Sequence, residues 1–107
     1  MSRVSQEDSL QSQSANSQRR WRADVYVTLK PVVNDPQGLA VRDGLHMLGY
    51  DEVGAVRAGK YIQVWLEADE EAGAEKRVAE MCDKLLANPV IEQYRFNLVE
   101  QAHDEAE

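Results

Sequence analysis

The chain has 107 residues, 43% of them hydrophobic, and a formal net charge of -7 at pH 7. This length predicts one domain that has a core but leaves much of its surface exposed, and the acidic balance disfavours nucleic acid and anionic membranes as partners. The lone Cys82 excludes an internal disulfide, and the lack of a signal peptide or of an apolar run near the roughly 18 residues of a membrane span predicts a cytoplasmic protein.

Both ends of the chain have the composition of tails. Residues 1–21 are rich in Ser and Gln and poor in large apolar residues, so we expect a disordered N-terminal tail. Residues 101–107 form a short acidic tail that we expect to fray. The single domain is therefore expected to span residues 22–100.

The first predicted strand covers residues 23–30, where apolar residues such as Val25 alternate with polar ones such as Thr28. A helix follows, because Asp35 suits the N-cap and Pro36 suits the first helical position, and Gly49 should end it. One side of this helix is apolar, at spacing i, i+4 and i+7, and must pack against another surface: Val41, Leu45 and Leu48.

Two further strands are predicted after this helix. Residues 53–57 form a short strand, Gly59 and Lys60 mark a turn, and residues 61–68 alternate as the next strand, so the two should make a hairpin.

A second helix over residues 69–88 and a last strand over residues 91–99 complete the domain. The helix should bury one stripe of side chains: Ala74, Val78, Met81, Cys82 and Leu85.

The order β-α-β-β-α-β predicts an α+β, ferredoxin-like fold with a four-stranded antiparallel sheet and both helices on one face. The other face should stay open, with aromatic and polar side chains: Tyr26, Thr28, Tyr61, Gln63, Trp65, Gln93, Arg95 and Asn97. This mixture is typical of interfaces. We therefore expect at least a dimer, with Tyr26, Tyr61, Trp65 and Arg95 at the oligomer interface.

The segment from Gly54 to Lys60 nearly matches a phosphate-binding P-loop, but Tyr61 replaces the Ser or Thr and a strand follows where a helix should. We reject a nucleotide site here. What remains is a turn that displays Arg57 and Lys60, which could contact a partner's carboxylates.

No other residues suggest autonomous chemistry. His46, His103 and Cys82 lack metal-ligand spacing, and nothing combines a nucleophile, a base and an oxyanion site. We expect no catalytic residue and no metal site.

Asp35 is explained by its role as a helix cap, but Asp35 and Gln37 are also candidates for partner binding, as are Arg57 and Lys60. In the expected fold the loop that holds Asp35 and the turn that holds Lys60 lie at opposite ends of the sheet, so they should not form one site.

Several short motifs, in their order and spacing, resemble the PurS family over residues 23–100: Leu29-Lys30-Pro31, Asp35-Pro36-Gln37-Gly38, Leu48-Gly49-Tyr50, Val56-Arg57 and Gly59-Lys60. The chain departs from the family at Val32-Val33 and in its long N-terminal extension. PurS is the small subunit of phosphoribosylformylglycinamidine synthase, a ligase complex of purine biosynthesis that uses ATP, magnesium and glutamine. The resemblance implies a non-catalytic subunit that binds no cofactor itself, bridges the glutaminase subunit (PurQ) and the synthetase subunit (PurL), and assists ammonia transfer.

Two other functions suit the expected fold. One is a dimeric small-molecule sensor that holds its ligand between subunits. The other is an RNA-binding module that stacks bases on Tyr26, Tyr61 and Trp65, which the charge of -7 disfavours.

Overall fold

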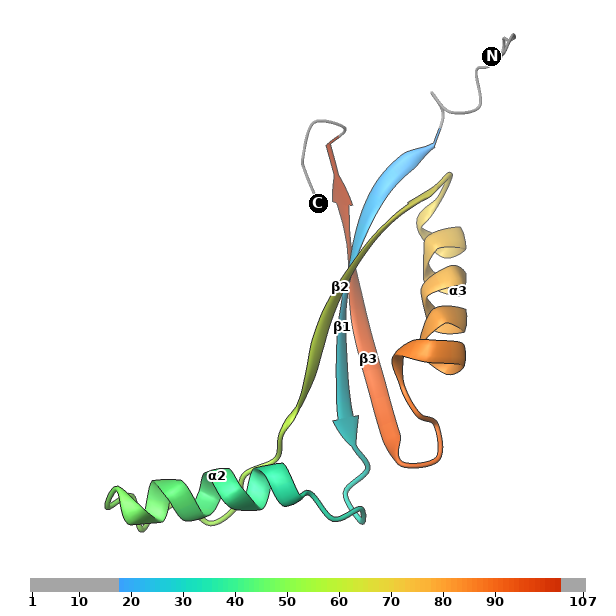
Figure 1. Cartoon of the computed structure of the whole chain (residues 1–107). Coiled ribbons are helices and arrows are strands. Elements are labelled where there is room, and N and C mark those ends of the chain that lie inside the picture. Colours follow the sequence, from blue (N-terminus) through green and yellow to red (C-terminus); the bar gives the residue numbers. More distant parts are fainter. Residues whose placement is uncertain (1–17, 103–107) are drawn as a thin grey trace, which may run out of the picture.

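A computed structural model of the chain describes residues 18–102 and shows an α+β fold with two α-helices and a three-stranded antiparallel sheet (Figure 1). The elements follow in this order: β1 (Arg19–Leu29), α2 (Pro36–Met47), β2 (Gly59–Ala68), α3 (Glu71–Met81), the π-helical turn η1 (Cys82–Leu86) and β3 (Glu92–Gln101). Within the described residues, no helix is both long enough and apolar enough to cross a membrane.

The strand order is β2-β1-β3, so β1 is central and antiparallel to both neighbours. Tyr26 on β1 lies opposite Tyr61 on β2 and opposite Arg95 on β3. Because β2 and β3 both oppose β1, they run parallel to each other. The segment that joins them must cross β1, and it contains α3, which lies along one face of the sheet (Figure 1).

The predicted strand over residues 53–57 does not form, so the four-stranded sheet and the hairpin are wrong. This segment runs beside α2 rather than beside another strand: the carbonyl oxygen of Val53 lies 2.7 Å from Nε2 of His46, and the carbonyl of Val56 faces Gly38 in the first turn of α2. Gly59 and Lys60, predicted as a turn, are instead the first residues of β2.

The central strand begins at Arg19, earlier than predicted, because Trp21 is part of the sheet. Its side chain is 3% exposed, and its indole N–H donates to the carbonyl of Ala68 (3.2 Å). The boundary at residue 21 is therefore too late, whereas the rest of the predicted N-terminal tail, residues 1–17, lies outside the described residues. So do residues 103–107 of the predicted acidic tail.

The core lies between α3 and the sheet. Val25 and Val27 of β1 pack with Val78 of α3 and Cys82 of η1, and all four side chains are fully buried. Alternate residues of β1 therefore point to the opposite face, as the sequence pattern predicts, and Cys82 is a core residue.

The π-helical turn shifts the buried stripe at the end of α3. The N–H of Ala87 donates to the carbonyl of Cys82, five residues earlier (3.0 Å), so each residue after Cys82 is displaced around the helix axis. Leu86 therefore packs against the core, whereas Leu85, predicted to be buried, is 83% exposed.

The helix α2 begins at Asp35 and Pro36 as predicted, and Gly49, with φ of +99°, lies just after its end. It does not cover the sheet, however, so the prediction of two helices on one face is wrong. It projects from the end of β1 (Figure 1). We call α2 and the segment that returns from it, residues 36–58, the arm.

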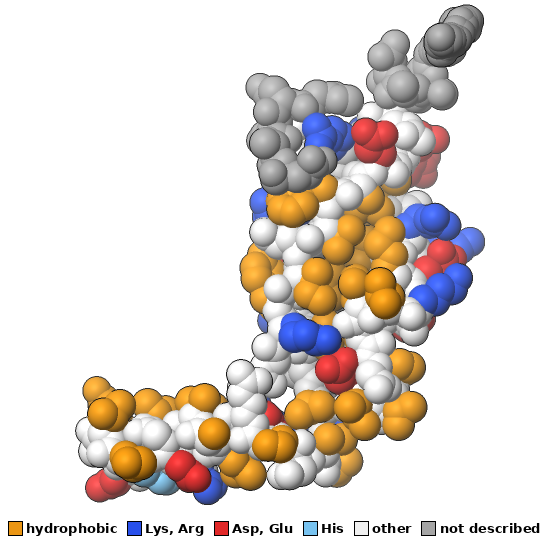
Figure 2. Space-filling model, viewed as in Figure 1, with side chains coloured by type: hydrophobic (Ala, Val, Ile, Leu, Met, Phe, Trp, Pro, Cys, Tyr) orange, Lys and Arg blue, Asp and Glu red, His pale blue; other side chains and the backbone are white. Residues whose placement is uncertain are grey.

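The apolar side of the arm is exposed. Val41 is 45% exposed and Leu48 is 74% exposed, and Leu39, Met47 and Tyr50 are also exposed. Figure 2 shows hydrophobic side chains both along α2 and over the strands. The predicted apolar stripe is thus present, but residues 18–102 do not make the contact expected for it.

The burial observed in α3 and η1 predicts different costs for truncating two members of the stripe that the sequence predicts to be buried. Val78→Ala should lower the free energy of unfolding by about 2 kcal/mol, because it leaves a cavity in the core. Leu85→Ala should change it by less than about 0.5 kcal/mol, because that side chain is exposed. Urea denaturation measures both values, and equal losses would contradict the shifted stripe.

Candidate functional site

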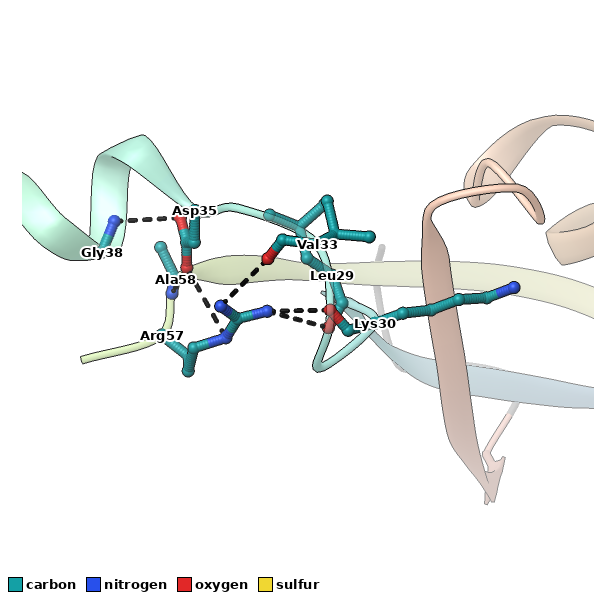
Figure 3. A network of polar contacts seen from close by, with 7 residues as sticks. All are labelled: Leu29, Lys30, Val33, Asp35, Gly38, Arg57 and Ala58. Atoms are coloured by element: carbon teal, nitrogen blue, oxygen red, sulfur yellow. Dashed lines mark hydrogen bonds and ion pairs between the residues drawn. The ribbon is translucent and has the colours of Figure 1, made fainter. Parts of the chain in front are cut away.

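The carboxylate of Asp35 joins the two ends of the arm (Figure 3). Its Oδ1 accepts a hydrogen bond from the backbone N–H of Gly38 (2.9 Å), which is the N-cap contact that the sequence predicts. Its Oδ2 accepts from the backbone N–H of Ala58 (2.8 Å), next to the start of β2. The side chain is only 5% exposed. One carboxylate therefore holds both the segment that enters α2 and the segment that returns from it.

Arg57 reinforces this contact from the returning segment (Figure 3). Its Nη1 donates to the carbonyl of Val33 (3.2 Å), and its Nη2 donates to the carbonyl of Lys30 (3.0 Å). Its Nε lies 4.0 Å from Oδ2 of Asp35, within ion-pair distance. We call Asp35, Arg57 and the backbone groups that they bind the clasp.

The clasp requires glycine at position 38. A Cβ there would collide with the carbonyl oxygen of Val56 and would also lie within 2.6 Å of Oδ2 of Asp35. The first turn of α2 therefore packs directly on the returning backbone. This explains why a glycine stands inside a helix, where it costs about 1 kcal/mol relative to alanine.

The structure brings together the residues that the sequence predicts as separate sites. Asp35, Gln37 and Lys60 line one cavity of about 260 Å³ at the end of the sheet, so the prediction that Asp35 and Lys60 lie at opposite ends is wrong. The reason is that β2 begins at Gly59, directly opposite Thr28 near the end of β1.

Of these residues, Lys60 pairs with Glu92 (Nζ to Oε2, 3.7 Å), and Gln37 is exposed. Asp35 and Arg57 are already engaged within the chain. Arg57 is therefore a structural contact and not only the solvent-facing charge that its predicted turn position indicated.

The clasp also affects ionisation. Hydrogen bonds from the N–H groups of Ala58 and Gly38, in that order of importance, hold the pKa of the Asp35 carboxyl below its ordinary value, and Arg57 adds to this effect. Partial burial opposes it. The carboxylate is therefore charged near neutral pH, as both of its contacts require.

The open face of the sheet carries the four residues predicted for an oligomer interface. The rings of Tyr26 and Tyr61 stack with centroids 5.1 Å apart, and the guanidinium of Arg95 lies 4.1 Å from the centroid of Tyr26. A cavity of about 470 Å³ adjoins these side chains. Farther along this face, the indole N–H of Trp65 is buried and has no partner among residues 18–102.

Sequence reasoning missed an ion pair on this open face. Arg22 donates to Asp24 (Nε to Oδ1, 2.9 Å), and Asp24 is only 8% exposed. The hydrogen bond from Arg22 is the main reason why the pKa of the Asp24 carboxyl is lowered, and Gln63 assists it. The available signal was the i, i+2 spacing, which places Arg22 and Asp24 on one face of a strand.

The clasp and the open face consist of hydrogen bonds, ion pairs and ring contacts, which can hold and position parts of the protein. Among residues 18–102, no three His, Cys, Asp or Glu side chains gather in a way that could hold a metal ion. The exposed arm and the aromatic open face define a small α+β protein whose apolar surface exceeds what one chain covers, as in subunits of larger assemblies.

Comparison with known proteins identifies the family. Residues 22–100 match the family model of PurS, phosphoribosylformylglycinamidine (FGAM) synthase. The PurS subunit of Synechocystis sp. is 57% identical over 78 residues, which cover 73% of this chain and 78% of that protein. The chain therefore belongs to the PurS family, the PurS subunits of FGAM synthase in purine biosynthesis.

Solved structures agree with this assignment. PurS of Bacillus subtilis has a TM-score of 0.67 and 48% identity, and the match covers 75% of this chain and 99% of that one. A chain in the structure of PurLQS from Thermotoga maritima has a TM-score of 0.67 and 29% identity, and the match covers 77% of this chain and 98% of that one. The alternatives of a small-molecule sensor and an RNA-binding module are not favoured.

The lowered pKa of Asp35 predicts a pH-dependent effect of Asp35→Asn. An amide oxygen cannot replace both carboxylate contacts, so the variant should be less stable than the unchanged protein at pH 7. A depressed pKa gives stability that is present above the unfolded value of about 4 and is lost as pH falls through the folded value. The difference in the free energy of unfolding between Asp35→Asn and the unchanged protein should therefore become smaller below about pH 4.

Urea denaturation at a series of pH values measures this difference. Asp43→Asn is the control, because Asp43 is exposed on the arm and its ion pair is with the neighbouring Arg42. A difference between Asp35→Asn and the unchanged protein that stays constant down to the most acidic sample would contradict the clasp as the cause.

Proposed function

We propose that this chain is the bridging subunit of its FGAM synthase, which joins a glutaminase subunit (PurQ) to a synthetase subunit (PurL) and assists ammonia transfer between them. The observation that carries this proposal is the match to a chain of PurLQS from Thermotoga maritima over 98% of that chain. The exposed apolar side of α2 and the aromatic open face support it, because both offer contact surface to other chains.

The chemistry of the complex belongs to its other subunits in this proposal. The reaction consumes ATP, magnesium and glutamine, whereas this chain binds none of them and acts in the cytoplasm. Its contribution is contact surface: Gln37 and Lys60 beside the cavity at the base of the arm are the partner-facing residues, and Asp35 and Arg57 hold that base in shape.

Self-association is the second part of the proposal. A helix with an exposed apolar side is unfavourable in water, and no extensive contact joins α2 to the strands or to α3. A second copy would cover this side. The aromatic open face, with Tyr26, Tyr61, Trp65 and Arg95, offers a second surface of interface composition.

Reconstitution tests the bridging role. A mixture of this chain, the glutaminase subunit and the synthetase subunit should form FGAM with glutamine as the nitrogen source, and omission of this chain should abolish that activity. Activity with added ammonium salt should persist without this chain, because ammonia then reaches the synthetase from solution. Equal glutamine-dependent rates with and without this chain would refute the proposal.

Two double variants test self-association. Val41→Ser with Leu48→Ser removes apolar surface from the arm, and Tyr61→Ser with Trp65→Ser removes it from the open face. Each should weaken the oligomer at least about tenfold, the usual effect of losing central interface side chains. Sedimentation over a range of concentrations measures this change.

The control for both is Val90→Ser, which removes an apolar side chain that is 77% exposed and lies outside the two surfaces. If one double variant sediments like the unchanged protein, the surface that it alters is not part of the interface. Unchanged sedimentation of both double variants would exclude these surfaces altogether.

A further inference from the structure

We propose that the clasp fixes the direction of the arm, and that Arg57 is a positioning residue for assembly. This inference rests on the proposed self-association for its functional consequence. Its structural part, the direction of the arm, depends only on the contacts within one chain.

The topology explains why the arm needs such a device. Since β1 and β2 are adjacent antiparallel strands, residues 30–58 replace what could be a short hairpin turn. Closing so long a connection costs more chain entropy than closing a tight turn. The helix gains little from the sheet in return, because no extensive contact joins them. Contacts at the base must therefore determine where the helix points.

The clasp provides contacts on both sides of this base. Asp35 binds the N–H of Gly38 at the start of α2 and the N–H of Ala58 at the end of the arm. Arg57 reaches in the opposite direction, from the end of the arm to the carbonyls of Lys30 and Val33 in the loop before α2 (Figure 3). Two sets of hydrogen bonds between the segment that enters α2 and the segment that returns from it restrict their relative rotation more than one set can.

The shape of the guanidinium suits Arg57 to this role. Its planar fork donates from Nη1 to Val33 and from Nη2 to Lys30 while Nε faces Asp35. An ammonium group has one nitrogen on a flexible stem and cannot hold these three acceptors in a fixed plane. Arg57→Lys should therefore keep the charge but lose most of the orientation.

The clasp lies apart from the core. Arg57 is 42% exposed, and the buried side chains of the core belong to the sheet, α3 and η1. Loss of Arg57 should therefore release the arm without unfolding the sheet. If the orientation needed for assembly falls to about a third of the population in each copy, the apparent affinity of self-association falls about tenfold, because both copies must hold that orientation.

The direct test measures the arm in a single chain. Spin labels on Asp51→Cys at the tip of the arm and on Glu67→Cys in β2, with the buried Cys82 replaced by Ala, report the distance between the arm and the sheet. A large excess of unlabelled chain keeps the measured pairs within one molecule. The unchanged clasp should give a narrow distance distribution, and Arg57→Ala and Arg57→Lys should both broaden it.

Arg77→Ala is the matched control, because it removes an arginine whose ion pair is with Glu80 on α3 and not with the loop before α2. It should leave the distribution narrow. Thermal melting and sedimentation of the same variants complete the test: Arg57 variants should melt like the unchanged protein within a few degrees but self-associate about tenfold more weakly.

The outcomes separate the two levels of the proposal. An equally narrow distribution in Arg57→Ala would overturn the positioning role. A broadened distribution with unchanged self-association would overturn the link to assembly. An unchanged protein that is monomeric at all concentrations would refute the proposed self-association, and the distance measurement would still decide the role of Arg57.

Discussion

The Asp35 carboxylate is the contact on which the shape of the molecule depends. It is held between two backbone N–H groups that are distant in sequence, those of Gly38 and Ala58, and it is nearly buried. A buried carboxylate without such donors would be costly, so the two segments must stay together to satisfy it. The sheet ends and the arm begins at this point, and Arg57 determines the geometry around it.

The parts of the fold that depend on neighbours in sequence were predictable. The alternation in β1 identified the buried face, and the Asp35 and Pro36 pair located the start of α2. The failures involve contacts that the local pattern does not determine: residues 53–57 lie beside α2 instead of pairing with a strand, and the π-helical turn packs Leu86 against the core in place of Leu85. In the site, Asp35 was recognisable as a cap, but its bond to Ala58 and the carbonyl contacts of Arg57 depend on how the arm returns, which no local pattern encodes.

The distribution of apolar side chains connects the fold with the function of a PurS subunit. Val78 and Cys82 complete a small core against β1, which α3 covers. The apolar side of α2 is too far from this core to contribute to it. The buried core of such a chain lies between the sheet and α3. The apolar side of α2 stays available for contacts with other molecules, as a subunit with a contact function requires.

The strand ends have a consequence for the covalent order of the chain. Arg20 at the start of β1 lies opposite Gln101 at the end of β3, so the first and last strands begin and end together, and the arm leaves from the other end of the sheet. A linker between those two strand ends, with new termini opened at the tip of the arm, would give a circular permutant. In such a chain the arm would consist of two free ends, held together by the clasp at its base and by the contact between His46 and the carbonyl of Val53 nearer its tip.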